Sequence, residues 1–410
     1  MVFIKGYLKS GFLYFGATFF GPIIGLLSNP LLAENLSHSD YAIVGYFTSF
    51  QALLIPVVGF NLNAYYLRNY HTTPEDRRKV LSDTILLGQG LVGAVAFFIF
   101  TVVFYIYYSF NGREFPFFPY AIYAFSQIYA SIFATFYLLR LRIERKASIY
   151  ALTTLAISVF YVFLTLLFVV YFKEGADGKL ISALAASVLT GIYSLLKSTY
   201  RFQIDLRVLK EGLLFGFPLT VSALFWYFLT GVDKALLMEI GDTRTYGTYI
   251  VAGQIAGYVA IFYSAINTIV EPDIYKAIAD KQVLKLRNLM LGTLCAVGAI
   301  NLLYVALAPR VIGILTANRY VESADFSRIL ALQNITMAAY YLIVKLFVGY
   351  GFLKEELAVR IIGAGIAFVM FVVLVDRFGF YGAAWGQVFS FAILAILGAA
   401  VFYLKIKKNK

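Results

Sequence analysis

The chain of 410 residues is 61% hydrophobic and 18% aromatic, with 14% charged residues and a formal net charge of +12. A soluble domain carries about 25% charged residues and has no core large enough to hide this much apolar side chain, so lipid must surround most of the chain. One cysteine, Cys295, excludes internal disulfides, and two histidines without ligand partners at helical spacing argue against metal sites and His-based catalysis.

Apolar stretches of about 20 residues, separated by short charged loops, predict about twelve transmembrane helices. In the first half they lie at 11–33, 41–67, 80–108, 116–139, 148–172 and 180–198. In the second half they lie at 212–231, 246–270, 284–308, 328–350, 357–375 and 381–404. The predicted fold is an all-α polytopic membrane protein with two six-helix lobes, residues 1–204 and 205–410.

Lysine and arginine residues predict the orientation of these helices. Of the 34 in the chain, 24 fall in loops assigned to one side of the membrane and nine in loops on the other side. Positive residues collect in cytoplasmic loops, so both termini are predicted to be cytoplasmic and the first helix to be uncleaved. Because the basic residues are dispersed among short loops, a nucleic-acid partner is not expected.

Polar residues of the second predicted helix recur in the eighth helix at an offset of 203 residues. Their spacing places them on one face of each helix, where they predict the lining of a cavity. The alternative is that they make hydrogen bonds between packed helices. The residues are Gln51, Asn61, Tyr65 and Arg68 in the first half and Gln254, Ser264, Thr268 and Glu271 in the second.

Lys345, in the tenth predicted helix, is the best candidate for a charged residue that serves a function inside the membrane. Asn334 and Tyr341 share its helical face, and together they predict a site that offers a cation and hydrogen-bond donors to an anionic ligand. The alternative is that Lys345 snorkels to lipid phosphates at the cytoplasmic end of the helix.

Asp233 and Lys234 directly follow the seventh predicted helix, and Asn29 lies at an equivalent depth in the first. They predict a gate between the lobes. An ion pair with a structural role at the outer interface is the alternative for Asp233 and Lys234.

Several motifs, in this order and spacing, resemble the polysaccharide (O-antigen-type) flippase family of the multidrug/oligosaccharidyl-lipid/polysaccharide exporter superfamily. The resemblance covers nearly the whole chain. The motifs are Asp40-Tyr41 through Gly45-Tyr46, Arg77-Arg78-Lys79, Gly216-Phe217-Pro218, Asp233-Lys234, Tyr246-Gly247-Thr248-Tyr249, Glu271-Pro272-Asp273-Ile274-Tyr275 and Phe378-Gly379-Phe380-Tyr381-Gly382-Ala383-Ala384.

The resemblance implies a flippase that turns an undecaprenyl-pyrophosphate-linked oligosaccharide, an O-antigen or capsule repeat unit, from the cytoplasmic to the periplasmic leaflet of the bacterial inner membrane. It implies as partners the lipid bilayer, the lipid-linked glycan and polysaccharide polymerase or chain-length machinery. No cofactor is expected, and coupling to protons, sodium or the membrane potential stays open. One departure is that Lys345 is the single clear cation for a cavity, with Arg68 and Arg140 near the cytoplasmic mouths.

Two other functions fit less well. An ion-coupled drug antiporter of the same superfamily needs a membrane-embedded carboxylate, and the predicted spans offer Asp83 and Glu271 near their cytoplasmic ends. A polysaccharide polymerase or ligase needs catalytic residues in an outer loop, and the longest such loop, 309–327, shows no catalytic arrangement. A transporter is therefore expected in preference to an enzyme.

Overall fold

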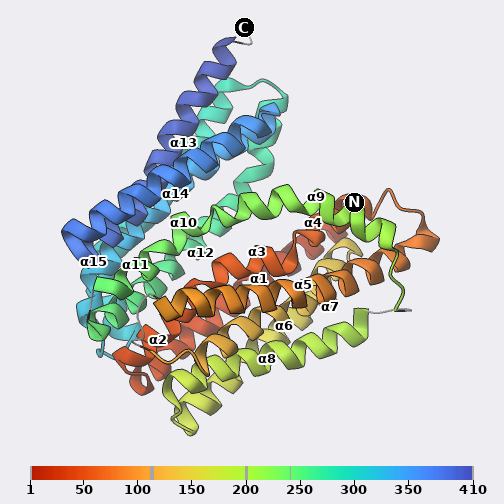
Figure 1. Cartoon of the computed structure of the whole chain (residues 1–410). Coiled ribbons are helices and arrows are strands. Elements are labelled where there is room, and N and C mark those ends of the chain that lie inside the picture. Colours follow the sequence, from red (N-terminus) through yellow and green to blue (C-terminus); the bar gives the residue numbers. More distant parts are fainter. Residues whose placement is uncertain (1, 111–114, 199–201, 241, 409–410) are drawn as a thin grey trace. The chain divides into compact units, whose positions relative to one another are not determined.

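The computed structural model describes residues 2–110, 115–198, 202–240 and 242–408, with the side chains of these ranges except at 2–15, 17, 18 and 239. This part of the chain is helical and contains no strand. It forms two compact units, Met1–Leu224 and Phe225–Lys410, which are described one at a time (Figure 1).

Unit 1 (Met1–Leu224) consists of helices joined by short loops, with a π-helical turn, η2, after α7. In chain order they are α1 Val2–Asn35, α2 His38–Ser49, α3 Gln51–Gly59, α4 Leu62–Asn69, η1 Glu75–Arg77, α5 Arg78–Phe110, α6 Tyr120–Ile143, α7 Ala147–Leu166, η2 Leu167–Tyr171, α8 Gly175–Ser198 and α9 Leu206–Leu224.

Unit 2 (Phe225–Lys410) ends in the longest helix of the chain. Its elements are α10 Tyr227–Thr230, α11 Val232–Ile240, α12 Thr243–Ala279, α13 Val283–Leu315, η3 Val321–Ser323, α14 Ala324–Tyr350 and α15 Leu353–Lys408.

Ten helices in the described residues are long and apolar enough to cross a membrane. Each coincides with one or two of the predicted spans, and the predicted 11–33 lies within α1. The apolar side chains that remain exposed on α5, such as Leu91, Val95 and Phe98, are those expected to face lipid. An all-α polytopic fold is confirmed, whereas the total of twelve spans, the lobe boundary at 204 and the cytoplasmic termini stay predictions.

The predicted spans 357–375 and 381–404 both belong to α15, which folds back on itself at Gly379. This residue has φ 54° and ψ −130°, a conformation open almost only to glycine. Three residues later, a Cβ atom on Gly382 would stand 1.9 Å from the carbonyl oxygen of Leu374. The two glycines of the Phe378–Ala384 motif therefore make the sharp turn between the two halves of α15.

The predicted continuous helix 41–67 is wrong, because the chain is helical there in three pieces, α2, α3 and α4. Phe60 and Asn61 adopt the left-handed conformation, with φ of 45° and 49°. Asparagine tolerates this region, but a bulky phenylalanine is strained there by about 1–3 kcal/mol. Apolar residues continue across Phe60 and Asn61 at helical spacing, so the sequence pattern does not indicate the break in the helix.

The break is held open by α9. A Cβ atom on Gly216 would lie 2.1 Å from the carbonyl oxygen of Phe60, so only glycine lets the two backbones approach this closely. Nearby, the Asn61 amide donates to the hydroxyl of Thr220 at 3.1 Å. Close approach at small residues is the usual way in which membrane helices pack, and here it fixes α3 and α4 against α9.

Candidate functional site

The best-defined charged site of unit 2 lies between α12 and α14. Lys345 of α14 stands 3.4 Å from a carboxylate oxygen of Glu271 on α12 and also donates to the side-chain carbonyl of Asn267. The Asn267 amide in turn donates to Glu271 at 3.2 Å. The Lys345 side chain is 8% exposed and that of Glu271 is 39% exposed. A buried cation is thus covered by a carboxylate that still reaches the surface of the unit.

Aromatic rings extend this site on one side. Tyr341, one helical turn before Lys345, stacks on Tyr263 of α12 with 6.1 Å between the ring centroids and 18° between the planes. Trp226, just before α10, lies 6.0 Å from the same tyrosine. Tyr341 and Lys345 are four residues apart on α14 and so lie on one face of this helix, and their role in ligand binding stays a prediction.

A second ion pair flanks this aromatic group. Arg360 of α15 stands 2.5 Å from Glu356, and the hydroxyl of Tyr340 donates to the same glutamate at 3.2 Å. Arg360 and Glu356 are not among the site residues predicted from the sequence. The four-residue spacing of Glu356 and Arg360 was the signal available, because such pairs meet on one helix face.

Asn334 is not brought into contact with Lys345. Its amide donates to the side chain of Asn301 on α13 at 3.1 Å and to the carbonyl of Ala256 on α12 at 3.4 Å, inside the unit. These contacts tie α12, α13 and α14 together. The observed partners of Asn334 are those of a packing residue.

The predicted polar face of α12 is exposed along much of its length. Gln254, Ser264 and Thr268 are all exposed, and Thr268 donates back to the carbonyl of Ser264 at 2.8 Å. Glu271 continues this line to the ion pair with Lys345. An exposed polar face on a helix that can cross a membrane is more consistent with a water-filled cavity than with lipid.

The corresponding residues of unit 1 split into two groups. Gln51 donates to Ala124 and Gln127 of α6, at 2.8 and 2.9 Å. The break at Phe60 and Asn61 turns the others toward α9, where Tyr65 donates to Glu211 at 3.0 Å and Asn61 to Thr220. The guanidinium of Arg68 lies 5.2 Å from the ring centre of Phe215. The expected single stripe is wrong in this half, since Gln51 lies apart from the other three.

Asp233 and Lys234 form an ion pair at 3.4 Å at the start of α11. Asp233 is 1% exposed and also accepts a hydrogen bond from the hydroxyl of Tyr249 at 2.8 Å. Lys234 donates to the carbonyl of Thr230. Asn29 is buried in α1 of unit 1. Their role as a gate stays a prediction.

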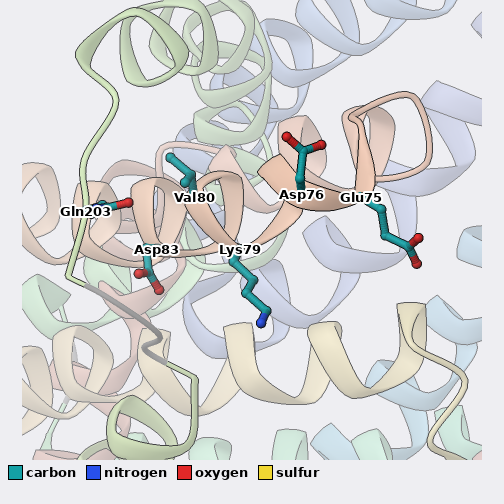
Figure 2. A pocket seen from close by; sticks show the side chains of 6 residues that line it. All are labelled: Glu75, Asp76, Lys79, Val80, Asp83 and Gln203. Carbon is teal, nitrogen blue, oxygen red and sulfur yellow. The ribbon is translucent and has the colours of Figure 1, made fainter.

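Unit 1 also contains a polar cavity of about 580 Å³ where η1 and α5 meet the segment before α9. Figure 2 shows its lining side chains: five come from η1 and the first turns of α5, and Gln203 comes from the segment before α9. The lining contains three carboxylates and one lysine, so the cavity does not suit a phosphate group. Its lining residues are Glu75, Asp76, Lys79, Val80, Asp83 and Gln203.

Among the described residues, no group of three His, Cys, Asp or Glu side chains is placed to hold a metal ion. A metal site in this part of the chain would have to use amide, hydroxyl or main-chain oxygens.

Comparison with known proteins gives a family and a fold. Residues 7–276 match the family described as polysaccharide biosynthesis protein. A curated relative, the uncharacterized membrane protein MJ1375 of Methanocaldococcus jannaschii, is 23% identical over 264 residues, which cover 60% of this chain and 62% of the relative. The match thus spans less than two thirds of that relative's length.

Solved structures of similar fold cover nearly the whole chain. An inward-facing multidrug resistance MATE family transporter of the MOP superfamily matches with a TM-score of 0.70 and 17% identity, over 95% of each chain. The lipid II flippase MurJ, in an inward closed conformation, matches with a TM-score of 0.72 and 16% identity, over 96% of this chain and 87% of MurJ. A MOP superfamily transporter from Pyrococcus furiosus matches with a TM-score of 0.64 and 17% identity, over 98% and 96%. At these identities the likeness shows the fold alone, which the chain shares with these three solved structures.

Proposed function

The chain belongs to the polysaccharide biosynthesis protein family, and from this membership we propose that it is a flippase for a lipid-linked oligosaccharide. The substrate in this proposal is a glycan repeat unit on undecaprenyl pyrophosphate, which moves from the cytoplasmic to the periplasmic leaflet of a plasma membrane. MurJ, a flippase for lipid II, shares the fold over 96% of this chain and supports the assignment by analogy.

The polarity of this substrate explains why a protein is needed to move it across the membrane. A sugar head group with a pyrophosphate cannot cross about 30 Å of hydrocarbon without a polar path. Alternating access of two lobes, proposed here as residues 1–204 and 205–410, offers that path while the lipid tail stays between helices. Polysaccharide polymerase and chain-length machinery are the proposed partners on the far side.

The observation that carries the proposal is the covered cation at Lys345. The Glu271 carboxylate neutralises Lys345 in the absence of ligand, and its partial exposure lets an incoming phosphate replace it. Exchange of one anion for another keeps the buried charge compensated throughout, which avoids the cost of a bare ion in the membrane. The stacked pair of Tyr341 and Tyr263, with the tilted ring of Trp226 next to Tyr341, offers flat apolar faces to sugar rings beside it.

The test is a transport assay with the purified protein in liposomes that carry labelled undecaprenyl-pyrophosphate oligosaccharide in one leaflet. Exposure of the glycan to an impermeant glycosidase on the other side should be faster with the protein than without it. Lys345→Met should slow this exposure at least about tenfold, in the range expected for loss of one charge-assisted contact. Lys354→Met, at an exposed lysine of α15, is the matched control and should leave the rate unchanged.

One observation favours a second function, an ion-coupled antiporter of small molecules. Such a transporter needs a carboxylate shielded from water that can bind the coupling ion, and Asp233 is buried with Tyr249 as its partner. If no glycan is exposed in the assay above and the same vesicles exchange an organic cation for protons or sodium, the antiporter is the better assignment. Loss of that exchange in Asp233→Asn would identify Asp233 as the carboxylate that binds the coupling ion.

A further inference from the structure

An apolar groove of about 620 Å³ lies between α3 and α5 of unit 1. Four of its lining residues on α5 are spaced four positions apart and so form one ridge along the helix: Leu91, Val95, Ile99 and Val103. These side chains are 56–61% exposed. From the first to the last, the ridge runs about 18 Å, which is more than half of the hydrocarbon thickness of about 30 Å in a membrane.

The other side of the groove is lined by Val57 of α3 and by Phe60, which directly follows this helix. Phe60 adopts the left-handed conformation, with φ 45°. A bulky residue stays in this conformation only where the surrounding structure holds it there, and such strain occurs mostly at functional sites. A straight helix would face ordinary lipid equally well, so the strained residue indicates that the groove has a specific role.

Contacts on both sides of the break fix the shape of the groove. Gly93 of α5 lets α3 lie directly on it, since a Cβ atom there would be 3.0 Å from the carbonyl oxygen of Val58. Gln89 of α5 donates to the carbonyl of Gly59 at 3.3 Å and to the side chain of Asn63 on α4 at 3.0 Å. Five of the nine lining residues are valine or isoleucine, whose χ1 rotation is restricted. The groove is therefore stiff.

The composition of the lining identifies the class of ligand. All nine side chains are hydrocarbons, so they offer neither a hydrogen bond nor a charge to a polar group. The helix α5 is long and apolar enough to cross a membrane, and most residues in its apolar part are not buried, so the groove is expected to face the hydrocarbon of the bilayer. Its volume lies in the range of about 300–1,000 Å³ that small-molecule sites have. The ligand that fits is the hydrocarbon chain of a lipid.

The stiffness of the groove favours an isoprenoid chain over a saturated acyl chain. Lipid tails are as apolar as the groove, so hydrophobic burial gives no preference and affinity depends on van der Waals packing. An isoprenoid has a methyl branch and a rigid double bond in each unit. It therefore packs more fully into a groove of fixed width, and it loses less conformational entropy on binding than a saturated chain does.

We propose that this α3–α5 groove binds the polyisoprenoid chain of a lipid carrier. The proposal rests on the proposed function, because the undecaprenyl carrier of the substrate is such a chain. Unit 1 then holds the lipid tail through contacts that do not involve the sugars. The protein can therefore recognise the same carrier whichever glycan it bears, and the strained Phe60 serves to shape one side of the binding surface.

The test is photocrosslinking of the full-length protein in phospholipid nanodiscs. The probe is undecaprenyl phosphate that carries a diazirine in its isoprenoid chain and no sugar, and peptide mass spectrometry locates the adducts after irradiation. We expect adducts on residues 57–60 and 91–103. Excess unlabelled undecaprenyl phosphate should remove most of these adducts, whereas the same excess of added phospholipid should not.

Two variants of the groove should weaken this labelling. Ala96→Phe places a ring among the lining residues and should reduce the adducts at least about tenfold. Val95→Ala combined with Ile99→Ala lowers the ridge at exposed positions, where the change does not endanger folding, and should also reduce them. Val102→Ala combined with Ile106→Ala is the matched control, because both residues are exposed on α5 and neither lines the groove.

Adducts that lie elsewhere in the wild type overturn the proposal, as does competition by phospholipid that equals competition by undecaprenyl phosphate. Labelling that persists in both groove variants, or that falls equally in the control variant, also overturns it. The readout is separate from transport, since the probe carries no sugar and does not need to cross the membrane. Groove labelling without glycan transport would reject the proposed function alone, and glycan transport without groove labelling would reject the groove alone.

Discussion

At the scale of single residues, two ion pairs on the membrane-crossing helices of unit 2 have members that differ in exposure. Lys345 is almost enclosed while Glu271 reaches the surface, and Arg360 and Glu356 form a second pair close to the same tyrosines. Because one member is enclosed and the other is accessible to water, removing each of them has a different effect on stability. Removing Glu271 leaves the buried charge of Lys345 uncompensated, while removing Lys345 leaves a carboxylate that water can reach.

This inequality gives a stability prediction. Glu271→Gln should lower the free energy of unfolding by about 3–5 kcal/mol, the cost of an uncompensated buried ion, and Lys345→Met should lower it by less. The double variant should recover most of the loss, because a neutral pair needs no compensation. Unfolding of the wild type and the three variants in one detergent gives the free energies of this double-mutant cycle. Equal losses of unfolding free energy in the two single variants would show that Lys345 is solvated in the folded protein.

A second residue-scale prediction concerns the start of α12. The side chain of Asp242 caps this helix by accepting from the backbone N–H of Thr245 at 2.9 Å and from its hydroxyl at 2.6 Å. Hydrogen bonds from the Thr245 hydroxyl and then from its backbone N–H lower the pKa of Asp242 below its ordinary value of 3.8. Asp242→Ala should therefore cost about 1 kcal/mol at neutral pH.

The pH dependence of that cost follows from the sign of the shift. A carboxylate whose pKa is lower in the folded protein stabilises it fully above the unfolded pKa, and this contribution is lost as the pH falls through the folded value. The difference in unfolding free energy between wild type and Asp242→Ala should thus be constant from about pH 7 to 5 and shrink below about pH 4. Asp242→Asn is the control, since asparagine caps a helix without titrating in this range.

At the scale of helices, the joint between α3 and α4 depends on a glycine far away in the sequence. Gly216 allows the carbonyl of Phe60 to lie where any side chain would collide with it. The strain of a left-handed phenylalanine is thus balanced by backbone packing on α9 and by the hydrogen bond of Asn61 to Thr220.

We therefore expect Gly216→Ala to be strongly destabilising, by about 2 kcal/mol or more, because the obstructing atom belongs to the backbone and cannot rotate away. Gly257→Ala on α12 is the matched substitution, since nothing lies within 4 Å of the added methyl group there. It should be neutral or stabilising by up to about 1 kcal/mol. Thermal unfolding of both variants makes the comparison, and similar melting temperatures would contradict the role given to Gly216.

At the scale of the whole molecule, hydropathy identified nearly all helices because each had to present about 20 apolar residues to lipid. What hydropathy could not show was backbone geometry, such as the break at Phe60 and the fold-back at Gly379, because lipid-compatible side chains continue across both. In the candidate site, Lys345 could be recognised as a charge inside a span. Its partner Asn267 and the pair of Arg360 with Glu356 depend on which helices pack together, and spacing along one helix does not contain that information.

The predicted orientation can be tested with the single native cysteine removed. In a Cys295→Ser background, a cysteine at Lys281, in a predicted cytoplasmic loop, should react with an impermeant maleimide only after cell lysis. A cysteine at Glu322, in a predicted outer loop, should react in intact cells. Both side chains are exposed, so accessibility within the protein does not limit the reaction. Reversed labelling would show that the helices cross the membrane in the orientation opposite to the predicted one.

The fit between Gly216 and Phe60 also bears on how such chains diverge over evolution. A relative that acquires a side chain at 216 can keep its packing only if the second membrane helix straightens at 60, which favours helix-forming residues at 60 and 61. The three positions should therefore change together across descendants, although about 155 residues of chain separate 61 from 216. A lineage in which 216 drifts freely while Phe60 and Asn61 persist would be one in which this joint no longer forms.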